Sequence, residues 1–137
     1  MKPENQQPKA LRVKAWKMMS ELVRRKYADA DGYVVCYTCD KPMHWKDSQA
    51  GHAIGGRTNY LLFECEEAIR VQCRHCNVFL GGNYSIFIPR LIEDYGRNGV
   101  DIFQSYVRES RKVHKYTKKD YIALIHELEA RLGDLEG

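Results

Sequence analysis

The sequence predicts a small α+β fold in which a short middle segment of brief strands is flanked by α-helices. Apolar residues recur at helical spacing before residue 29 and after residue 83, and this period disappears between them. The middle segment also carries two Cys-x-x-Cys pairs. Apolar residues every three to four positions are typical of an amphipathic helix, whereas short apolar runs between turns are typical of strands.

The composition is that of one globular domain. The chain has 137 residues, of which 44% are hydrophobic and 29% are charged, and single domains commonly have roughly 100 to 150 residues. No stretch approaches the roughly 20 apolar residues of a membrane helix, and the polar start lacks the apolar segment of a signal peptide. We therefore expect a cytoplasmic protein without a membrane partner, with a loose leader at residues 1–8 and one domain at residues 9–137.

The first helix is expected over residues 9–28, with apolar residues on one face and basic residues on the other. Residues 84–137 are expected to hold the remaining helices. The first of these ends near Gly96, and Pro89 is acceptable in it if it lies in a first turn. The next helix closes in the basic pair at residues 111–112.

The last helix has a recognisable start. Thr117 can accept a hydrogen bond from a backbone N–H, and Asp120, three residues later, lies near the positive end of the helix, which makes a capping box. The buried face of this helix is predicted to consist of Tyr121, Leu124, Ile125, Leu128 and Leu132.

The segment at residues 33–82 is expected to form the core of the site. Residues 33–36 and 68–71 are apolar runs that indicate brief strands. This segment is too short to bury a core of its own, so metal ligation would supply folding free energy that apolar burial cannot.

Four cysteines give the most specific signal in the sequence. They form two Cys-x-x-Cys pairs separated by 33 residues: Cys36, Cys39, Cys73 and Cys76. Each pair can form a tight turn with both thiolates pointing at one ion, and two such turns complete the tetrahedral shell of a structural Zn²⁺. The alternative is a redox dithiol or a chance spacing. Cys65 falls outside the pattern and is expected to be a small buried residue, while His44 is expected to pack or hydrogen-bond beside Trp45.

The charge distribution indicates a polyanionic partner. The net charge is +4, but residues 1–32 carry eight Lys/Arg against four Asp/Glu, and residues 108–119 carry six against one. Neutralisation of phosphates with release of counterions drives affinity for nucleic acids, so two basic segments favour DNA as partner. Such runs are also found on ordinary solvated helix faces, and the charge alone does not decide between the two.

A histidine and an asparagine occupy informative positions relative to the cysteines. His52 lies between the two pairs, and Asn77 follows the last cysteine directly. If both side chains face one divalent ion, His52 can remove a proton from an attacking water, and the amide oxygen of Asn77 can hold Mg²⁺ or Mn²⁺ at a phosphate. Arg57 can brace that phosphate. A lone loop histidine is more often structural, and only the placement beside the cysteines favours catalysis.

These pieces resemble two groups of nucleases. A histidine between the cysteine pairs and a polar residue after the last cysteine are similar to the HNH and endonuclease VII-like enzymes, whose treble-clef or ββα-metal core is zinc-stapled. The chain also resembles the NinG (Rap) recombination endonucleases of lambda-like bacteriophages. The matching segments lie at residues 31–34, 36–39, 44–46, 50–52, 71–77, 81–82 and 115–120.

The resemblance implies a phage-encoded, structure-selective DNA endonuclease in the host cytoplasm. It would act on Holliday junctions, D-loops and related branches, would depend on Mg²⁺ or Mn²⁺, and would form a homodimer. The cysteines carry over as zinc ligands, and His52 and Asn77 as the active pair. The pattern departs at Gly51, where HNH enzymes often have an acidic residue, so Asn77 can be the only protein ligand of the catalytic metal. The alternative is a zinc module that binds nucleic acid without cutting it. The exposed apolar face of a terminal helix is the expected dimer interface.

Overall fold

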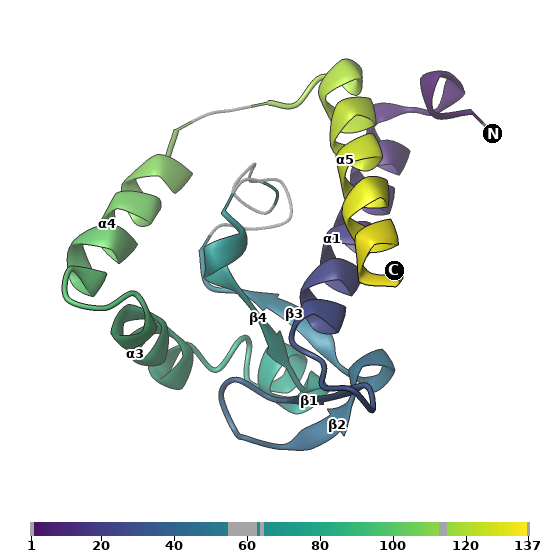
Figure 1. Cartoon of the computed structure of the whole chain (residues 1–137). Coiled ribbons are helices and arrows are strands. Elements are labelled where there is room, and N and C mark those ends of the chain that lie inside the picture. The colour runs from purple at the N-terminus through teal and green to yellow at the C-terminus, as the bar shows by residue number, and fades with distance from the viewer. Residues whose placement is uncertain (1, 55–62, 64, 113–114, 137) are drawn as a thin grey trace.

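A computed structural model describes residues 2–54, 63, 65–112 and 115–136 of the chain. Two antiparallel strand pairs lie between two groups of helices, with α1 and α5 on one side and α3 and α4 on the other (Figure 1). The mixed α+β architecture agrees with the sequence prediction. No helix in the described ranges has the length and apolar character needed to cross a membrane.

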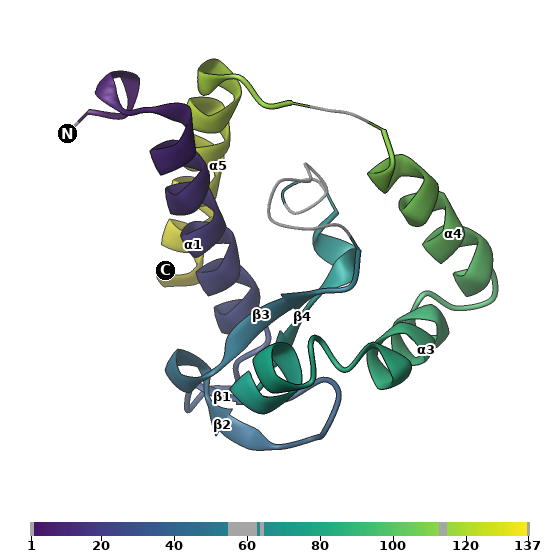
Figure 2. The same ribbon diagram turned by 180° about the vertical axis from the view of Figure 1, so that it is seen from behind.

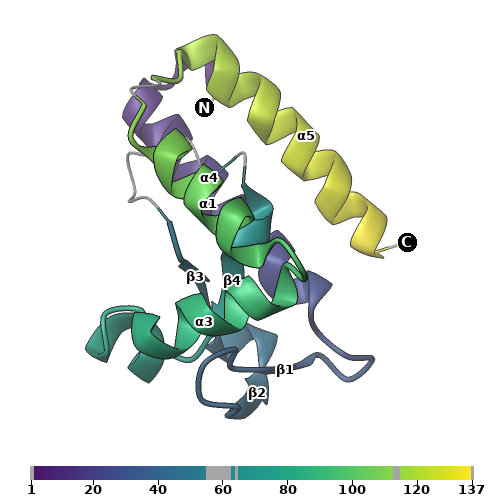
Figure 3. The ribbon, with the colours of Figure 1, turned by 90° about the vertical axis from the view of Figure 1, so that its left-hand side faces the viewer.

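The two terminal helices pack against each other. Helix α1 spans Pro8–Lys26 and α5 spans Lys118–Glu136, and they run side by side in the same direction, as Figure 3 shows from the side. An ion pair of 3.4 Å joins Arg25 to Glu136 near their carboxyl ends. The buried residues of the predicted α5 stripe belong to the core that also contains the apolar residues of α1. This stripe is therefore used inside the chain rather than offered to a second copy.

The start of α5 has the predicted capping box. The backbone N–H of Asp120 donates to Thr117 Oγ1 at 3.2 Å, and the backbone N–H of Thr117 donates to Asp120 Oδ2 at 2.8 Å. Two N–H groups that the helix leaves without internal partners are thereby satisfied.

Two short strand pairs form the middle of the chain. Strand β1 (Tyr33–Val35) pairs with β2 (Pro42–His44), and β3 (Gln49–His52) pairs with β4 (Ile69–Gln72). The sequence predicts β1 and β4 to within one residue. Their partners β2 and β3 carry no β-branched residue, and sequence pattern alone did not indicate them.

The β3–β4 pair buries its apolar face against α1. Ala50, Ile69 and Val71 lie in one core with Leu11 and Ala15 of that helix. The middle segment thus has little core of its own, as predicted, and depends on the terminal helices and on the cysteines for support.

Short helical turns connect these elements. Three are 3₁₀ turns, η1 (Pro3–Asn5), η2 (Trp45–Asp47) and η3 (Glu66–Ala68), and η4 (His75–Phe79) is a single π-helical turn. His44 caps η2, since its Nδ1 accepts from the backbone N–H of Lys46 at 3.2 Å, and its ring lies 5.9 Å from the Trp45 ring. This confirms the packing and hydrogen-bonding role expected for His44.

Helices α3 (Tyr84–Asp94) and α4 (Gly99–Ser110) follow η4. Pro89 lies inside α3, in its second turn, and not in the first turn, where a proline was expected to be acceptable. Proline has no N–H to donate within a helix, and α3 nevertheless continues to Asp94. At Gly99 an added β-carbon would lie 2.0 Å from the carbonyl oxygen of Ile92, so glycine permits the close approach of α4 to α3.

Candidate metal centre and nuclease site

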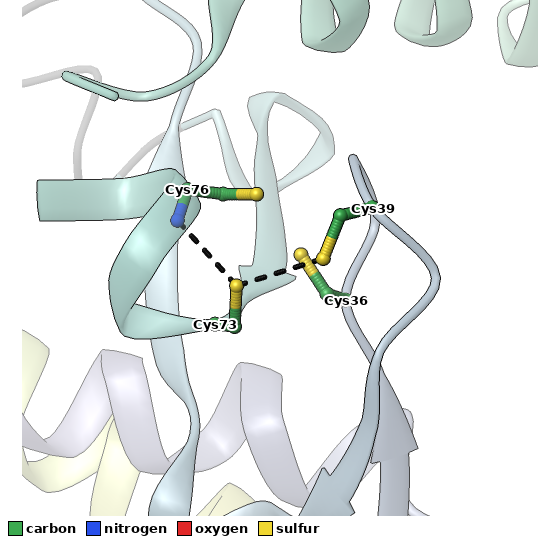
Figure 4. A group of neighbouring side chains, drawn as sticks. All are labelled: Cys36, Cys39, Cys73 and Cys76. Carbon is green, nitrogen blue, oxygen red and sulfur yellow. Dashed lines mark hydrogen bonds between the residues drawn. The ribbon is translucent and has the colours of Figure 1, made fainter. Parts of the chain in front are cut away.

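The four cysteines of the two pairs meet at one point. Their sulfurs all lie within 4.8 Å of one another. Figure 4 shows that Cys36 and Cys39 come from the loop between β1 and β2, while Cys73 and Cys76 come from the end of β4 and the start of η4. Segments 34 residues apart in sequence therefore supply one cluster.

Backbone hydrogen bonds set the shape of this cluster. The N–H of Asp40 donates to the carbonyl of Cys36 at 3.0 Å, and Asp40 adopts a left-handed φ of 65° that closes the first turn. The N–H of Asn77 donates to the carbonyl of Cys73 at 3.0 Å and closes the second. The two turns are joined by a bond of 2.8 Å from the N–H of Tyr37 to the carbonyl of Val71.

The cluster has the dimensions of a tetrahedral thiolate site. A Zn²⁺ ion with Zn–S distances of about 2.3 Å places its sulfurs about 3.8 Å apart, and the sulfurs of Cys39 and Cys73 are 3.7 Å apart. Asn83 Nδ2 lies 3.7 Å from the Cys76 sulfur and can donate to it, which is the type of outer contact that orients metal ligands. The four thiols can therefore hold one zinc ion.

The surroundings of the thiols shift their pKa values in opposite directions. Burial raises the pKa of Cys36, but hydrogen bonds from the Cys73 backbone and from Thr38 outweigh it and bring the pKa down to about 6. The backbone of Lys41 lowers the pKa of Cys39, whereas burial and hydrogen bonds with the other three thiols raise it to about 12. The Cys36 thiolate is thus stabilised by backbone N–H groups and by Thr38, and thiolate is the form that binds a metal.

Cys65 lies outside this cluster, as predicted. It is buried with Ile54 and Ala68 in a small separate core. Burial and the nearby charge of Glu67 raise its pKa to about 11. A neutral buried thiol of this kind is a packing residue and not a reactive one.

Asn77 lies in η4, immediately after the cluster. Its Nδ2 donates to Gln49 Oε1 of β3 at 2.8 Å. An added β-carbon on Gly51 would lie 3.2 Å from Asn77 Oδ1. The carboxamide therefore faces the β3 strand on the side of Gln49 and Gly51. Its oxygen lies next to Gly51, which has no side chain.

His52 is the last residue of β3, and its side chain contacts the N-terminal helix. The imidazole meets the ring of Trp16 edge to face, with 6.1 Å between centroids and an angle of 87°. Its carbonyl oxygen accepts a hydrogen bond of 3.0 Å from the Tyr84 hydroxyl. Successive side chains alternate between the faces of a strand, so His52 shares a face with Ala50, which is buried in the α1 core.

The two predicted catalytic side chains consequently leave β3 and η4 on different faces of the strand pair. Figure 2 shows α1 beside the strands and the short turn η4 in front of them. The structure brings Asn77 to the backbone next to His52, but it does not place the two side chains on one face. Their pairing stays a prediction. Arg57 lies outside the described residues, and so does its expected phosphate contact.

Gln72 is the residue of this site that the sequence did not reveal. It is fully buried at the end of β4, and its Nε2 donates to Thr38 Oγ1 at 3.1 Å and to the carbonyl of Gly82 at 2.8 Å. A β-carbon on Gly51 would lie 1.9 Å from Gln72 Oε1. The amide of Gln72 therefore occupies the space that a side chain at position 51 would fill, and a single glutamine gives no pattern by which sequence could have found it.

The basic residues of α1 divide into two groups. Arg24 donates to the carbonyls of Trp45 and Ser48 at 3.2 and 3.4 Å, and burial lowers its pKa. Lys26 lies 3.8 Å from Glu66. By contrast, Lys17 is exposed, with no carboxylate at ion-pair distance among the described residues. The basic face of α1 is thus partly committed to holding the fold.

One comparison with known proteins gave a match. A family model described as "Bacteriophage Lambda NinG protein" matches residues 3–137. Neither the curated proteins nor the solved structures gave a match. Because the family model spans nearly the entire chain, this protein belongs to the bacteriophage lambda NinG protein family.

Proposed function

We propose that this protein is a metal-dependent, structure-selective DNA endonuclease that hydrolyses phosphodiester bonds in branched recombination intermediates. The NinG resemblance implies Holliday junctions and D-loops as substrates. The observation that carries the proposal is the position of Asn77. Its backbone N–H donates to the carbonyl of Cys73 in the cysteine cluster, its Nδ2 donates to Gln49, and its amide oxygen lies beside Gly51, the residue before His52.

Each side chain has a defined task in this proposal. Zn²⁺ at the four cysteines would be structural rather than catalytic, because a closed tetrathiolate shell leaves no position for substrate. Its role would be to stabilise the fold. Asn77 would hold a Mg²⁺ or Mn²⁺ ion, which supplies charge neutralisation at the phosphate and the leaving 3′-oxygen. His52 would take the proton from the water whose oxygen bonds to phosphorus as the bond to the 3′-oxygen breaks.

The geometry adds one requirement to this mechanism. Since His52 and Asn77 leave different faces, a single phosphodiester would have to reach both faces at the end of β3. Arg57 is retained as the proposed brace of the phosphate.

DNA contact outside the site is proposed to be electrostatic. The exposed lysines of α1 and the basic segment at residues 108–119 would contact phosphates, so affinity should fall steeply with salt. Selection of a branch would depend on DNA shape and deformability rather than on base reading. Two symmetric cuts at a junction need two active sites, and a homodimer is therefore part of the proposal.

The direct test is cleavage of a synthetic four-way junction by zinc-loaded protein. We expect nicking with Mg²⁺ or Mn²⁺ and none when a chelator removes these ions but leaves the zinc bound. Absence of metal-dependent nicking at a large excess of protein over junction would contradict the proposal.

A second candidate function is a zinc module that binds nucleic acid without cutting it. Two observations favour it: His52 packs on Trp16, and position 51 has no carboxylate. Under this alternative the protein binds the junction with the same salt dependence but leaves every strand intact.

A further inference from the structure

The orientation of the Gln72 amide is fixed by its surroundings. Its Nε2 donates to the carbonyl oxygen of Gly82 at 2.8 Å, and a carbonyl can only accept. Exchanging the oxygen and nitrogen of the amide would place two acceptors against each other, so the nitrogen must face Gly82. The oxygen of Gln72 therefore points in the other direction, toward Gly51.

Gln72 Oε1 has no hydrogen-bond partner among the described residues. Among the buried side-chain nitrogen and oxygen atoms of these residues, Gln72 Oε1 is the one that lacks a partner. Buried polar atoms are almost always satisfied, by protein, water or an ion. The Gln72 amide is fully buried and is held in place by the two bonds that its nitrogen donates, so its oxygen is free to accept from, or bind to, a group outside the described residues.

The unpaired oxygen lies beside the oxygen of Asn77. An added β-carbon on Gly51 would be 1.9 Å from Gln72 Oε1 and 3.2 Å from Asn77 Oδ1. The two oxygens are consequently no more than about 5 Å apart, the sum of those distances. Two ligands of one octahedral Mg²⁺ ion at about 2.0–2.1 Å lie about 3 Å apart when adjacent and about 4 Å apart when opposite, and this upper limit includes both separations.

We propose that Gln72 Oε1 and Asn77 Oδ1 together bind the divalent cation of the nuclease site. This inference rests on the proposed function, and it names the protein oxygen that takes the place of the carboxylate expected next to His52. Hard cations such as Mg²⁺ and Mn²⁺ accept amide oxygens, and water and phosphate oxygens complete their shells. Gly51 is required because any side chain there would displace the Gln72 amide.

Binding of Mn²⁺ to zinc-loaded protein tests this inference without DNA or cleavage. Free Mn²⁺ is measured by electron paramagnetic resonance during a titration of wild type, Gln72→Met and Asn77→Ala. We expect each variant to bind Mn²⁺ about tenfold more weakly or worse, as for loss of a metal-orienting group. Ser48→Ala is the matched control. Ser48 is also buried, and its hydroxyl donates to the carbonyl oxygen of Trp45 at 2.6 Å, but it lies outside the site.

A second pair of variants covers the case in which Gln72→Met loses its zinc or its fold. Gly51→Ala leaves Gln72 intact but places a carbon 1.9 Å from its oxygen, so the amide must shift and Mn²⁺ affinity should fall. The double variant Gly51→Asp with Gln72→Ala puts a carboxylate into the vacated space and should restore Mn²⁺ binding to at least the wild-type level.

The outcomes separate this inference from the nuclease proposal. If folded Gln72→Met or Gly51→Ala protein binds Mn²⁺ as tightly as wild type, the oxygen of Gln72 is satisfied by water and the inference is overturned, whether or not the protein cuts DNA. If Mn²⁺ binding depends on Gln72 and Asn77 but no junction is nicked, the cation site stands and the nuclease proposal fails.

Discussion

The four-cysteine cluster and the pair formed by His52 and Asn77, both predicted from sequence, differ in that the structure brings together only the cysteine side chains. Both predictions relied on spacing along the chain. The structure brings the four sulfurs within 4.8 Å of one another, whereas it places the imidazole on the α1 face of β3 and the carboxamide on the η4 face.

The difference comes from how each arrangement is encoded. A Cys-x-x-Cys turn directs both thiolates to one point by local backbone geometry, so only the meeting of two turns needs the tertiary fold. The direction of His52 depends on strand register, where a shift of one residue reverses the face of every side chain. Spacing along the chain therefore predicts the meeting of the four cysteines more directly than the directions of His52 on β3 and Asn77 in η4.

Loss of one cysteine of the cluster should have the largest effect. Cys73→Ser is expected to lose zinc and to unfold, because structural zinc contributes about 10 kcal/mol or more to folding, comparable to the entire stability of a small domain. Zinc content by elemental analysis and a thermal melt by circular dichroism measure this. Cys65→Ala is the matched control and should keep its zinc; a Cys73→Ser protein that melts like the parent would disprove a structural zinc.

Substitution of His52 decides whether its imidazole acts in chemistry or only packs on Trp16. His52→Ala should reduce junction nicking by roughly 10²- to 10⁴-fold, the usual contribution of a general base, with zinc content and junction affinity unchanged. Trp16→Leu, which removes the ring that His52 contacts, serves as the comparison. Equal and small losses of activity in the two variants would show that His52 is a packing residue.

The two kinds of basic residue on α1 should differ in their effect on DNA affinity. Lys17→Ala should lower the slope of log affinity against log salt by about one if Lys17 contacts a phosphate. Lys26→Ala is expected to change the slope less, since Lys26 already lies 3.8 Å from Glu66. Filter binding of a four-way junction over a series of salt concentrations measures both slopes. Identical slopes for wild type and Lys17→Ala would remove this face of α1 from the DNA interface.

The capping box of α5 should give the smallest effect. Thr117→Ala removes the acceptor of the Asp120 N–H and should destabilise the protein by about 1 kcal/mol, without affecting zinc content. Urea denaturation followed by circular dichroism measures the difference. A variant with unchanged stability would show that the hydrogen bond between Thr117 and the Asp120 N–H does not stabilise the protein.

Local signals account for what could be predicted of the fold. The boundaries of the helices follow from apolar period and from residues such as Thr117 and Gly96, which act within one turn. Strand β3 was not predicted because its sequence, Gln-Ala-Gly-His, has no β-branched residue, and it exists through pairing with β4 and packing on α1. Gln72 was missed for a related reason: a buried glutamine is defined by what surrounds it, and Gly82 and Thr38 are distant in sequence.

We propose that the cysteine cluster positions Asn77 as part of a separate divalent-cation site that cuts DNA. This proposal is tested most directly by assaying zinc-loaded Asn77→Ala and wild type side by side on a four-way junction with Mn²⁺. We expect Asn77→Ala to keep its zinc and its junction affinity but no longer to nick the DNA. Cleavage at the wild-type rate by Asn77→Ala would contradict it.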